Sequence, residues 1–229
     1  MRTQNEDVWI KRYQIPTLKN PVAIVGSPGL RSIGKLVVDN LVDQTKATLV
    51  ADLYSTHLPS IYETQPSYAA HPSMPGEAGA VVESGKVDLP KVQFYASAEF
   101  SVIFVRGYHP NFEGQYLVAQ NVVDFLAEMG VQRMVVVAGF GTKDKKIVCA
   151  ANNPKSIEDM KTRFDVGLGY KGPFMGFSGL VFGMAKLRGI EAVCLFAGTE
   201  PVEENLEFPD AEASGRAVEL LNRMLSLKK

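Results

Sequence analysis

The sequence predicts a three-layer α/β fold in a single domain, residues 1–229, with a mixed but mostly parallel sheet flanked by helices. Four apolar runs end in glycine and lack the alternation of half-exposed strands, so we expect strands that are buried on both faces. Segments with helical spacing of apolar residues separate these runs, as a parallel sheet requires. The chain has 229 residues, of which 46% are hydrophobic and 21% are charged, and this suffices for one sizeable core. The four runs are Val22–Gly26, 102–107, 134–139 and 192–198.

The first half of the chain supplies its elements in a simple order. A polar segment, residues 1–20, precedes the first strand. Ile33, Val37 and Leu41 then recur at helical spacing, which predicts an amphipathic helix. Residues 48–53 follow as another strand candidate.

The remaining elements make the sheet mixed and close the domain. Residues 80–95 predict a β-hairpin with Gly85 at its turn. Residues 118–129 and 213–224 each place their apolar residues on one helical face. Gly130 is expected to end the first of these two helices.

Composition and charge exclude several classes of partner. Because 24 Lys and Arg stand against 25 Asp and Glu, the net charge of -1 offers no basic excess for nucleic acid or an anionic membrane. The longest uncharged stretch, residues 172–185, is too short to span a bilayer, and the polar start lacks the order of a signal peptide. We therefore expect a cytoplasmic protein without a membrane partner. Cys149 and Cys194 lie in apolar runs and indicate buried thiols, and no residue set indicates a metal or a cofactor.

Residues 29–35 match part of a phosphate-binding loop, GxxxxGK, after the first strand. Leu36 stands where such a loop places a hydroxyl on Mg²⁺, and Pro28 removes a backbone donor that an anion nest would use. Asp52, at the end of a strand candidate, would stand in for the metal-side carboxylate, although aspartates are common at strand ends. The interpretation is a structural turn, and we expect no tight binding of Mg-ATP.

Polar residues follow the strand ends that meet at one edge of the predicted sheet, where open α/β sheets form small-molecule crevices. Ser27, Arg31, His109 and Lys143 are the candidates for this crevice. Arg31 and Lys143 would supply an anion pocket, and His109 or Glu113 an acid or base. Similar residues occur at the loop edge of most α/β domains, so no catalytic residue is assigned.

Candidate protein-binding residues lie in two regions. Residues 55–79 carry four prolines, which exclude a sheet interior, together with Tyr62 and Tyr68, so we expect a partner-facing excursion. Tyr170, Phe174 and Met175 precede a glycine-rich helix and are more apolar than an exposed loop requires. The apolar surface of these three residues beside the helix predicts self-association.

That helix contains Gly179 and Gly183, four residues apart on one face. Two glycines at this spacing are expected to permit a close approach to a sheet or to another helix. Close packing is the preferred interpretation of the whole glycine run.

Three segments carry a resemblance to a known family. The turn formed by Pro28, Gly29, Leu30, Gly34 and Lys35, followed by residues 172–180 and then by 209–213, resembles the archaeal and bacterial relatives of the second proteasome assembly chaperone. The resemblance covers about residues 21–227. It implies a three-layer α/β fold similar to nucleoside phosphorylases and related hydrolases, with no established catalytic residues.

The resemblance also implies oligomeric assembly factors that bind proteasome α subunits. Some relatives dock through a C-terminal tail of a hydrophobic residue, tyrosine and any residue. This sequence ends Leu227-Lys228-Lys229, so docking through a tail is not expected.

These observations together predict a non-enzymatic protein-binding factor that self-associates and binds proteasome subunits, a second chaperone subunit or related partners. The alternative is a phosphorylase-like or hydrolase-like enzyme with a small-molecule site at the strand-end crevice. Shared fold does not decide between the two, because one fold supports many functions.

Overall fold

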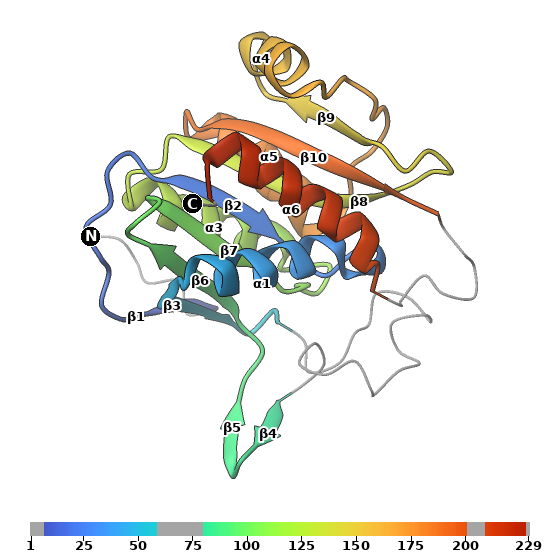
Figure 1. Ribbon diagram of the computed structural model, residues 1–229. Coiled ribbons are helices and arrows are strands. Elements are labelled where there is room, and N and C mark those ends of the chain that lie inside the picture. The colour runs from blue at the N-terminus through green and yellow to red at the C-terminus, as the bar shows by residue number, and fades with distance from the viewer. Residues whose placement is uncertain (1–6, 59–79, 201–208, 228–229) are drawn as a thin grey trace.

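The computed structural model describes residues 7–58, 80–200 and 209–227, which form an eight-stranded sheet covered by helices and a separate two-stranded hairpin (Figure 1). The main strands, in their order across the sheet, are β1 Val8–Arg12, β3 Thr48–Ser55, β6 Val92–Ser97, β7 Val102–Arg106, β2 Val22–Gly26, β8 Arg133–Gly141, β10 Glu191–Thr199 and β9 Ile147–Ala151. The helices are α1 Ile33–Thr45, α3 Gln115–Glu128, α4 Pro154–Phe164, α5 Gly176–Leu187 and α6 Ala211–Leu225, with a short 3-10 helix, η1 Leu30–Ser32, before α1. The hairpin consists of β4 Val81–Glu83 and β5 Lys86–Asp88.

The main sheet is mixed, as the sequence predicts, and five of its eight strands run in one direction. Strands β2, β7, β8 and β10 are mutually parallel neighbours, and β3 runs in the same direction because two antiparallel pairings, through β6, separate it from β7. Strands β1, β6 and β9 run the other way. The four glycine-ended runs thus form the buried centre of the sheet, where residues on both faces are covered.

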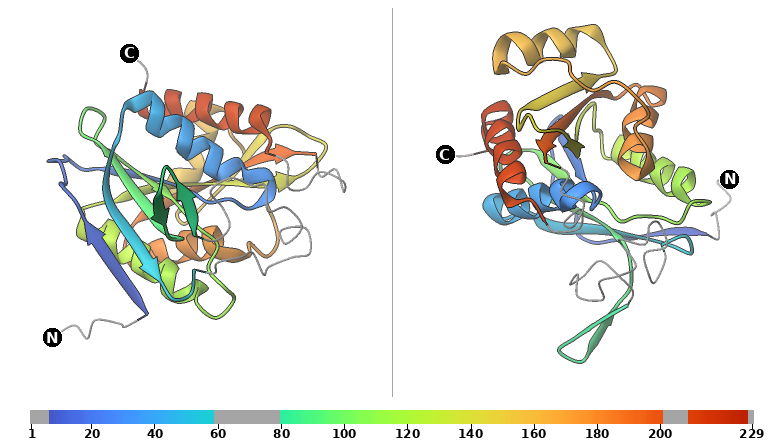
Figure 2. Two further views of the ribbon diagram at one scale, coloured as in Figure 1. Left: turned by 90° about the horizontal axis from the view of Figure 1, so that it is seen from below. Right: turned by 90° about the vertical axis from the view of Figure 1, so that its right-hand side faces the viewer.

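Helices cover both faces of this sheet and enclose two cores (Figure 2). On one face, α3 and α5 pack over a cluster that includes Phe94 and Phe125, whose ring centroids lie 4.7 Å apart. On the other face, α1 and α6 pack together over a cluster that includes Ile33 and Leu221. Helix α4 packs against β9 at one edge of the sheet. Among the described residues, no helix has both the length and the apolar character needed to cross a membrane.

The N-terminal segment differs from the prediction, because part of the polar segment 1–20 is strand β1, paired antiparallel with β3. Val8 is buried in the core beneath α3, while Trp9 on the opposite face is half exposed. Arg12 forms an ion pair with Glu128 of α3 and lies 5.0 Å from the ring centroid of Phe125. The long apolar stem and charged end of Arg12 therefore stabilise an edge strand that composition alone marks as polar.

The region 80–95 also differs in part. The hairpin turn is confirmed, with Ser84 and Gly85 both at positive φ, the conformation that two-residue hairpin turns use. However, the second strand ends at Asp88, and β6 begins at Val92 within the main sheet. Pro90 lies between them and lacks the N–H that a continuous strand would donate.

The glycine-rich helix α5 packs closely at one of the two glycines, Gly179 and Gly183, for which the sequence predicts close packing. A Cβ on Gly179 would overlap the backbone of Phe174, whereas a Cβ on Gly183 would meet no atom within 4 Å. Close approach is therefore required at Gly179 and not at Gly183.

Candidate functional site

The turn after β2 is held tightly against the sheet. Gly29 has φ 77° and ψ -157°, and Arg31 and Ser32 follow in the left-handed region, both with φ 51°. A Cβ on Gly34 would lie 2.6 Å from the carbonyl oxygen of Val137 in β8. Glycine is needed at position 29 because a side chain there would strain the backbone, and at position 34 because a side chain would displace strand β8. The turn thus fixes the start of α1 directly on the strands.

Lys35 does not face this turn as a phosphate-binding lysine would. Its Nζ lies 2.9 Å from Oδ2 of Asp39, one turn further along α1, and Asp39 also accepts a 2.6 Å hydrogen bond from Nε of Arg106. The Lys35 backbone N–H donates to the carbonyl of Ser27 at 3.0 Å. These contacts agree with a structural role for the turn formed by Pro28, Gly29, Leu30, Gly34 and Lys35.

Two of the four crevice candidates are used in packing at the strand ends. Ser27 is buried, and its Oγ lies 2.8 Å from Oγ of Ser178 near the start of α5. Nε2 of His109 accepts a 2.8 Å hydrogen bond from the Gly29 N–H. Burial lowers the pKa of His109 to about 4, so the imidazole is neutral at physiological pH and serves as an acceptor. This histidine, which is partly exposed, therefore supports the turn.

Gly107, directly after β7, adds a second close contact at this edge of the sheet. A Cβ there would lie 2.7 Å from the ring of Phe177 and 2.8 Å from Cβ of Ser27. Three segments distant in sequence thus meet in contact at the carboxyl ends of the parallel strands, where the sequence predicts a crevice.

Arg31 joins the turn to the start of α6. Its Nη1 donates to the hydroxyl of Thr199 at 3.2 Å and lies 3.3 Å from Oδ2 of Asp210. The Thr199 hydroxyl in turn donates to Asp210 at 2.5 Å, and Asp210 accepts the Ala213 N–H at 2.9 Å as the N-cap of α6. Lys143, the fourth candidate, is exposed on the turn between β8 and β9. The geometry therefore assigns Arg31 to a structural network, and Lys143 is not part of it.

The apolar residues predicted to bind partners are placed differently from one another. Tyr62 and Tyr68 lie outside the described residues, as does most of the segment 55–79. The ring of Tyr170 stacks on Phe196 at 4.3 Å, and the ring of Phe174 meets Phe196 edge to face at 4.9 Å. Met175 is 82% exposed. Tyr170 and Phe174 thus extend the core, and Met175 is the member of this group that faces solvent.

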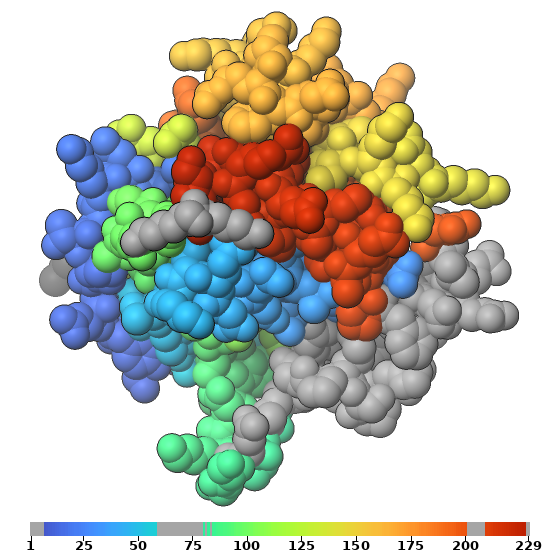
Figure 3. Space-filling view, viewed as in Figure 1, coloured from blue at the N-terminus to red at the C-terminus, as the bar shows by residue number. Residues whose placement is uncertain are grey.

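The sequence analysis did not identify the β4–β5 hairpin as a binding surface. This hairpin projects from the body of the molecule (Figures 1 and 3). Val82 and Val87 are directly opposite each other across its two strands and are 73% and 67% exposed, and Leu89 is also exposed. An isolated two-stranded hairpin is marginally stable in water, and covering adjacent exposed apolar side chains with a partner removes apolar surface from water. The sequence signal that would have identified this surface is the pair of valines, Val82 and Val87, on either side of the two-residue turn.

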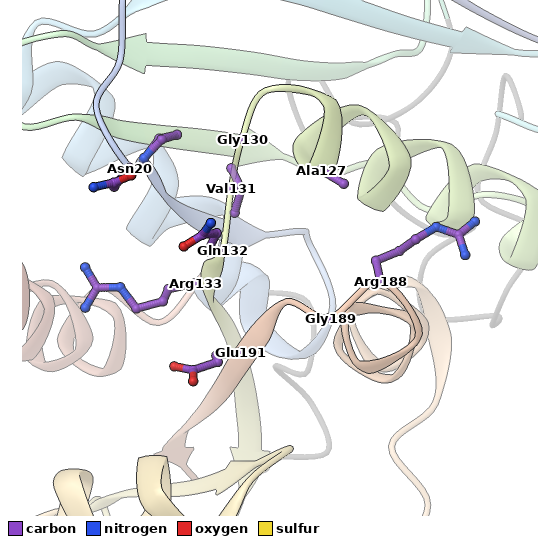
Figure 4. A pocket seen from close by; sticks show the side chains of 10 residues that line it. Asn20, Ala127, Gly130, Val131, Gln132, Arg133, Arg188, Gly189 and Glu191 are labelled. Carbon is purple, nitrogen blue, oxygen red and sulfur yellow. The ribbon is translucent and has the colours of Figure 1, made fainter.

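A hollow of about 520 Å³ lies at the opposite edge of the sheet, at the amino ends of β2, β8 and β10 (Figure 4). Arg133 and Glu191, which are register partners on neighbouring strands, line it together with Asn20 and Gln132. Figure 4 shows Arg188 directed away, towards α3. The polar side chains differ in charge and do not converge on one point, so this hollow indicates no particular chemistry.

Comparison with known proteins agrees with this architecture. The model of the PAC2 family matches residues 23–228. A curated uncharacterized protein of Methanocaldococcus jannaschii is 25% identical over 196 residues, which cover 82% of this chain and 69% of that protein.

Solved structures show the same fold. PbaB of Pyrococcus furiosus, described as an archaeal proteasome activator, superposes with a TM-score of 0.78 at 23% identity, covering 98% of this chain and 91% of PbaB. PbaA of the same organism, described as an archaeal homolog of proteasome-assembly chaperone, gives 0.72 at 20% identity, covering 97% and 87%. A proteasome-assembly chaperone homologue of Mycobacterium tuberculosis gives 0.64 at 15% identity, covering 90% and 86%. Because the family model spans nearly the whole chain and the fold agrees throughout, this protein is a member of the PAC2 family.

Proposed function

We propose that this protein is a non-enzymatic binding factor that acts in the cytoplasm on proteasome subunits, as a proteasome-related chaperone. The family, and structural neighbours described as a proteasome activator and as assembly-chaperone homologues, support this proposal. A second chaperone subunit is the other partner that fits the same proposal.

The observation that carries the proposal is the projecting β4–β5 hairpin with its exposed valine pair. Val82 and Val87 stand on the same face of the hairpin and have no apolar cover from the described part of the chain. Covering them with a partner removes apolar surface from water and orders a marginally stable element. The strand-end edge supports the same view, because His109 and Arg31 are held there by contacts within the protein.

The test compares the hairpin with another apolar surface of the same protein. The double variant Val82→Ser and Val87→Ser and the single variant Leu187→Ser, on α5, each remove exposed apolar side chains. Binding to purified proteasome α subunits from the source organism is measured by calorimetry, with native-state melting as the control for folding.

We expect the hairpin variant to weaken binding at least about tenfold, because centrally placed apolar anchors dominate protein interfaces. The Leu187 variant should bind as the wild type does. Equal affinity of the hairpin variant and the wild type would assign binding to another surface, and no binding by the wild type would overturn the proposed function.

A further inference from the structure

The main sheet has two edge strands, and the described part of the chain closes only one of them. At the β9 edge, the Cys149 N–H donates to the carbonyl of Gly167 at 2.9 Å, and Leu168 forms a parallel bridge with Cys149. Helix α4 packs against the same strand. At the other edge β1 pairs with β3, and no other described segment forms a backbone hydrogen bond with Val8–Arg12. The left view of Figure 2 shows β1 in blue at the rim of the molecule.

The pairing of β1 with β3 identifies the backbone groups that β1 leaves unused. The carbonyl of Asp7 accepts the N–H of Thr56 at 3.1 Å. Tyr13 donates its N–H to the carbonyl of Val50 at 2.8 Å. Because every second residue of an antiparallel strand bonds to its partner, the other odd-numbered residues between Asp7 and Tyr13 also bond to β3. The remaining residues of the strand direct their N–H and C=O groups away from β3, and these are Val8, Ile10 and Arg12.

Trp9 and Lys11 stand along this edge on the face opposite α3. The Trp9 ring stacks on Tyr54 with the centroids 5.8 Å apart, and it remains 49% exposed. Lys11 is exposed, and its Nζ lies 5.1 Å from the ring centroid of Tyr13. No carboxylate of the described residues forms an ion pair with Lys11. The edge therefore presents an aromatic surface and, two residues later, a cation that lacks an anionic partner in the described chain.

The charge of Lys11 selects what this edge can accept. A lysine on an edge strand opposes pairing with strands that would place apolar or basic side chains against the ammonium group. An acidic side chain opposite Lys11 removes this obstacle, because opposite charges across two strands stabilise the pair. The exposed ring of Trp9 suits an aromatic or aliphatic side chain beside it. The edge is thus closed to most strands and open to a strand with this pattern.

We propose that β1 binds an extended segment of a partner protein as an added antiparallel strand, in which an acidic residue precedes an aromatic or aliphatic residue by two positions. Main-chain hydrogen bonds to the outward groups of Val8, Ile10 and Arg12 supply affinity. Residues of the added strand opposite Trp9 and Lys11 occupy the positions without hydrogen bonds, where facing side chains lie closest. The acidic residue faces Lys11 and the apolar residue packs on Trp9. This surface is separate from the hairpin β4–β5, so the inference does not rest on the proposed function.

A short peptide tests the proposal with the full-length protein. The probe is Ser-Thr-Val-Glu-Val-Phe-Thr-Ser, acetylated and amidated at its ends, whose Glu is designed to face Lys11 and whose Phe is designed to face Trp9. Calorimetry should show saturable binding in the micromolar range. Trp9 is the single tryptophan of the chain, so a change in tryptophan fluorescence with the same affinity locates the peptide at β1.

Methylation of single backbone nitrogens of the peptide provides the decisive readout. The N–H of the valine between Glu and Phe would donate to Ile10, so methylating this nitrogen should abolish binding. The N–H of the peptide Glu would point away from β1, so methylating that nitrogen should leave the affinity within a few fold. Attraction between side chains alone does not predict this difference.

Charge exchange tests the role of Lys11. Lys11→Glu should weaken binding of the peptide at least about tenfold, and a peptide with Lys in place of its Glu should recover it. Lys161→Glu, the same change at an exposed lysine of α4, is the matched control and should leave binding unchanged. Circular dichroism and cooperative melting verify the folding of both variants. If Lys11→Glu does not fold, the two methylated peptides decide the question with the wild-type protein.

Three results would overturn the proposal. The first is equal binding of the two methylated peptides. The second is binding by calorimetry without a change in Trp9 fluorescence, or no binding at millimolar peptide. The third is an affinity for the peptide that falls as the protein concentration rises, because a second copy of the chain would then occupy the edge.

Discussion

Replacing Asp210 tests how the start of α6 is fixed to the turn after β2. In Asp210→Ala the lost N-cap should cost about 1 kcal/mol, and the lost hydrogen bond from Thr199 to a charged group about 1.5 to 3 kcal/mol. The partly exposed ion pair with Arg31 adds at most about 1 kcal/mol. Because these interactions share one carboxylate, we expect the free energy of unfolding to fall by about 3 kcal/mol in total.

Asp210→Asn separates the charge from the cap. Asparagine caps helices as well as aspartate does, so this variant should lose only about 1 to 2 kcal/mol of stability, the charged part of the contacts with Thr199 and Arg31. Burial raises the pKa of Asp210, but the hydrogen bonds from Ala213 and Thr199 and the charges of Arg31 and Arg216 outweigh burial and lower it overall. The stability that the ionised carboxylate contributes is therefore fully present above the ordinary aspartate pKa. It is lost as the pH falls through the lowered pKa of the folded state.

Urea unfolding at neutral and at acidic pH measures these differences. Glu219→Ala, which removes an exposed carboxylate from the same helix, is the matched control and should change stability by less than about 0.5 kcal/mol. The reasoning would be refuted if Asp210→Ala were as stable as Glu219→Ala, or if the difference between wild type and Asp210→Asn persisted at a pH well below the aspartate range.

Three further predictions concern the strand-end edge and the buried thiols. Gly107→Ala should lower the free energy of unfolding by about 1 to 3 kcal/mol, because the new Cβ would lie too close to a ring and to another side chain. Gly215→Ala, in the open middle of α6, should raise it by about 0.5 to 1 kcal/mol. Thermal melting of both variants checks this, and equal shifts in melting temperature would contradict it. Because the pKa of His109 is lowered to about 4, its imidazole should not titrate between pH 5 and 8 in an NMR titration. Between about pH 4 and 6.5 the unfolded chain binds a proton at this histidine that the folded protein does not, so stability should rise with pH over this range. Burial raises the pKa of Cys149 and raises the pKa of Cys194 well above its usual range. Neither thiol should therefore react with a disulfide reagent at neutral pH until the protein unfolds. Rapid modification of the native protein would contradict this and would show that the strands open locally.

The central strands were predictable because their signal is local. A strand covered on both faces must be apolar at successive positions, and β2, β7, β8 and β10 satisfy this within a few residues of sequence. The helices beside them follow from apolar spacing for the same reason. Buried Cys149 and Cys194 were predictable on the same basis, since the residues around each are apolar.

Strand β1 and the partners of the strand-end residues were not predictable in this way. The burial of Val8 depends on α3, which is more than a hundred residues later in the chain, and Arg12 is stabilised by Glu128 of that helix. His109 is an accessible base in the sequence but an acceptor in the fold, because the Gly29 N–H lies 2.8 Å away after the chain has closed.

The sequence by itself determined the four central strands and helices α1, α3 and α6, because the spacing of apolar residues within a segment decides which face it can bury. Only the tertiary structure decided which apolar side chains remain in contact with water. Tyr116 and Leu187 occur in helices of ordinary apolar content, as do the core residues Val122 and Val181. Their exposure arises because α3 and α5 meet along one side and leave the other open, and that is a property of two packed helices rather than of either sequence.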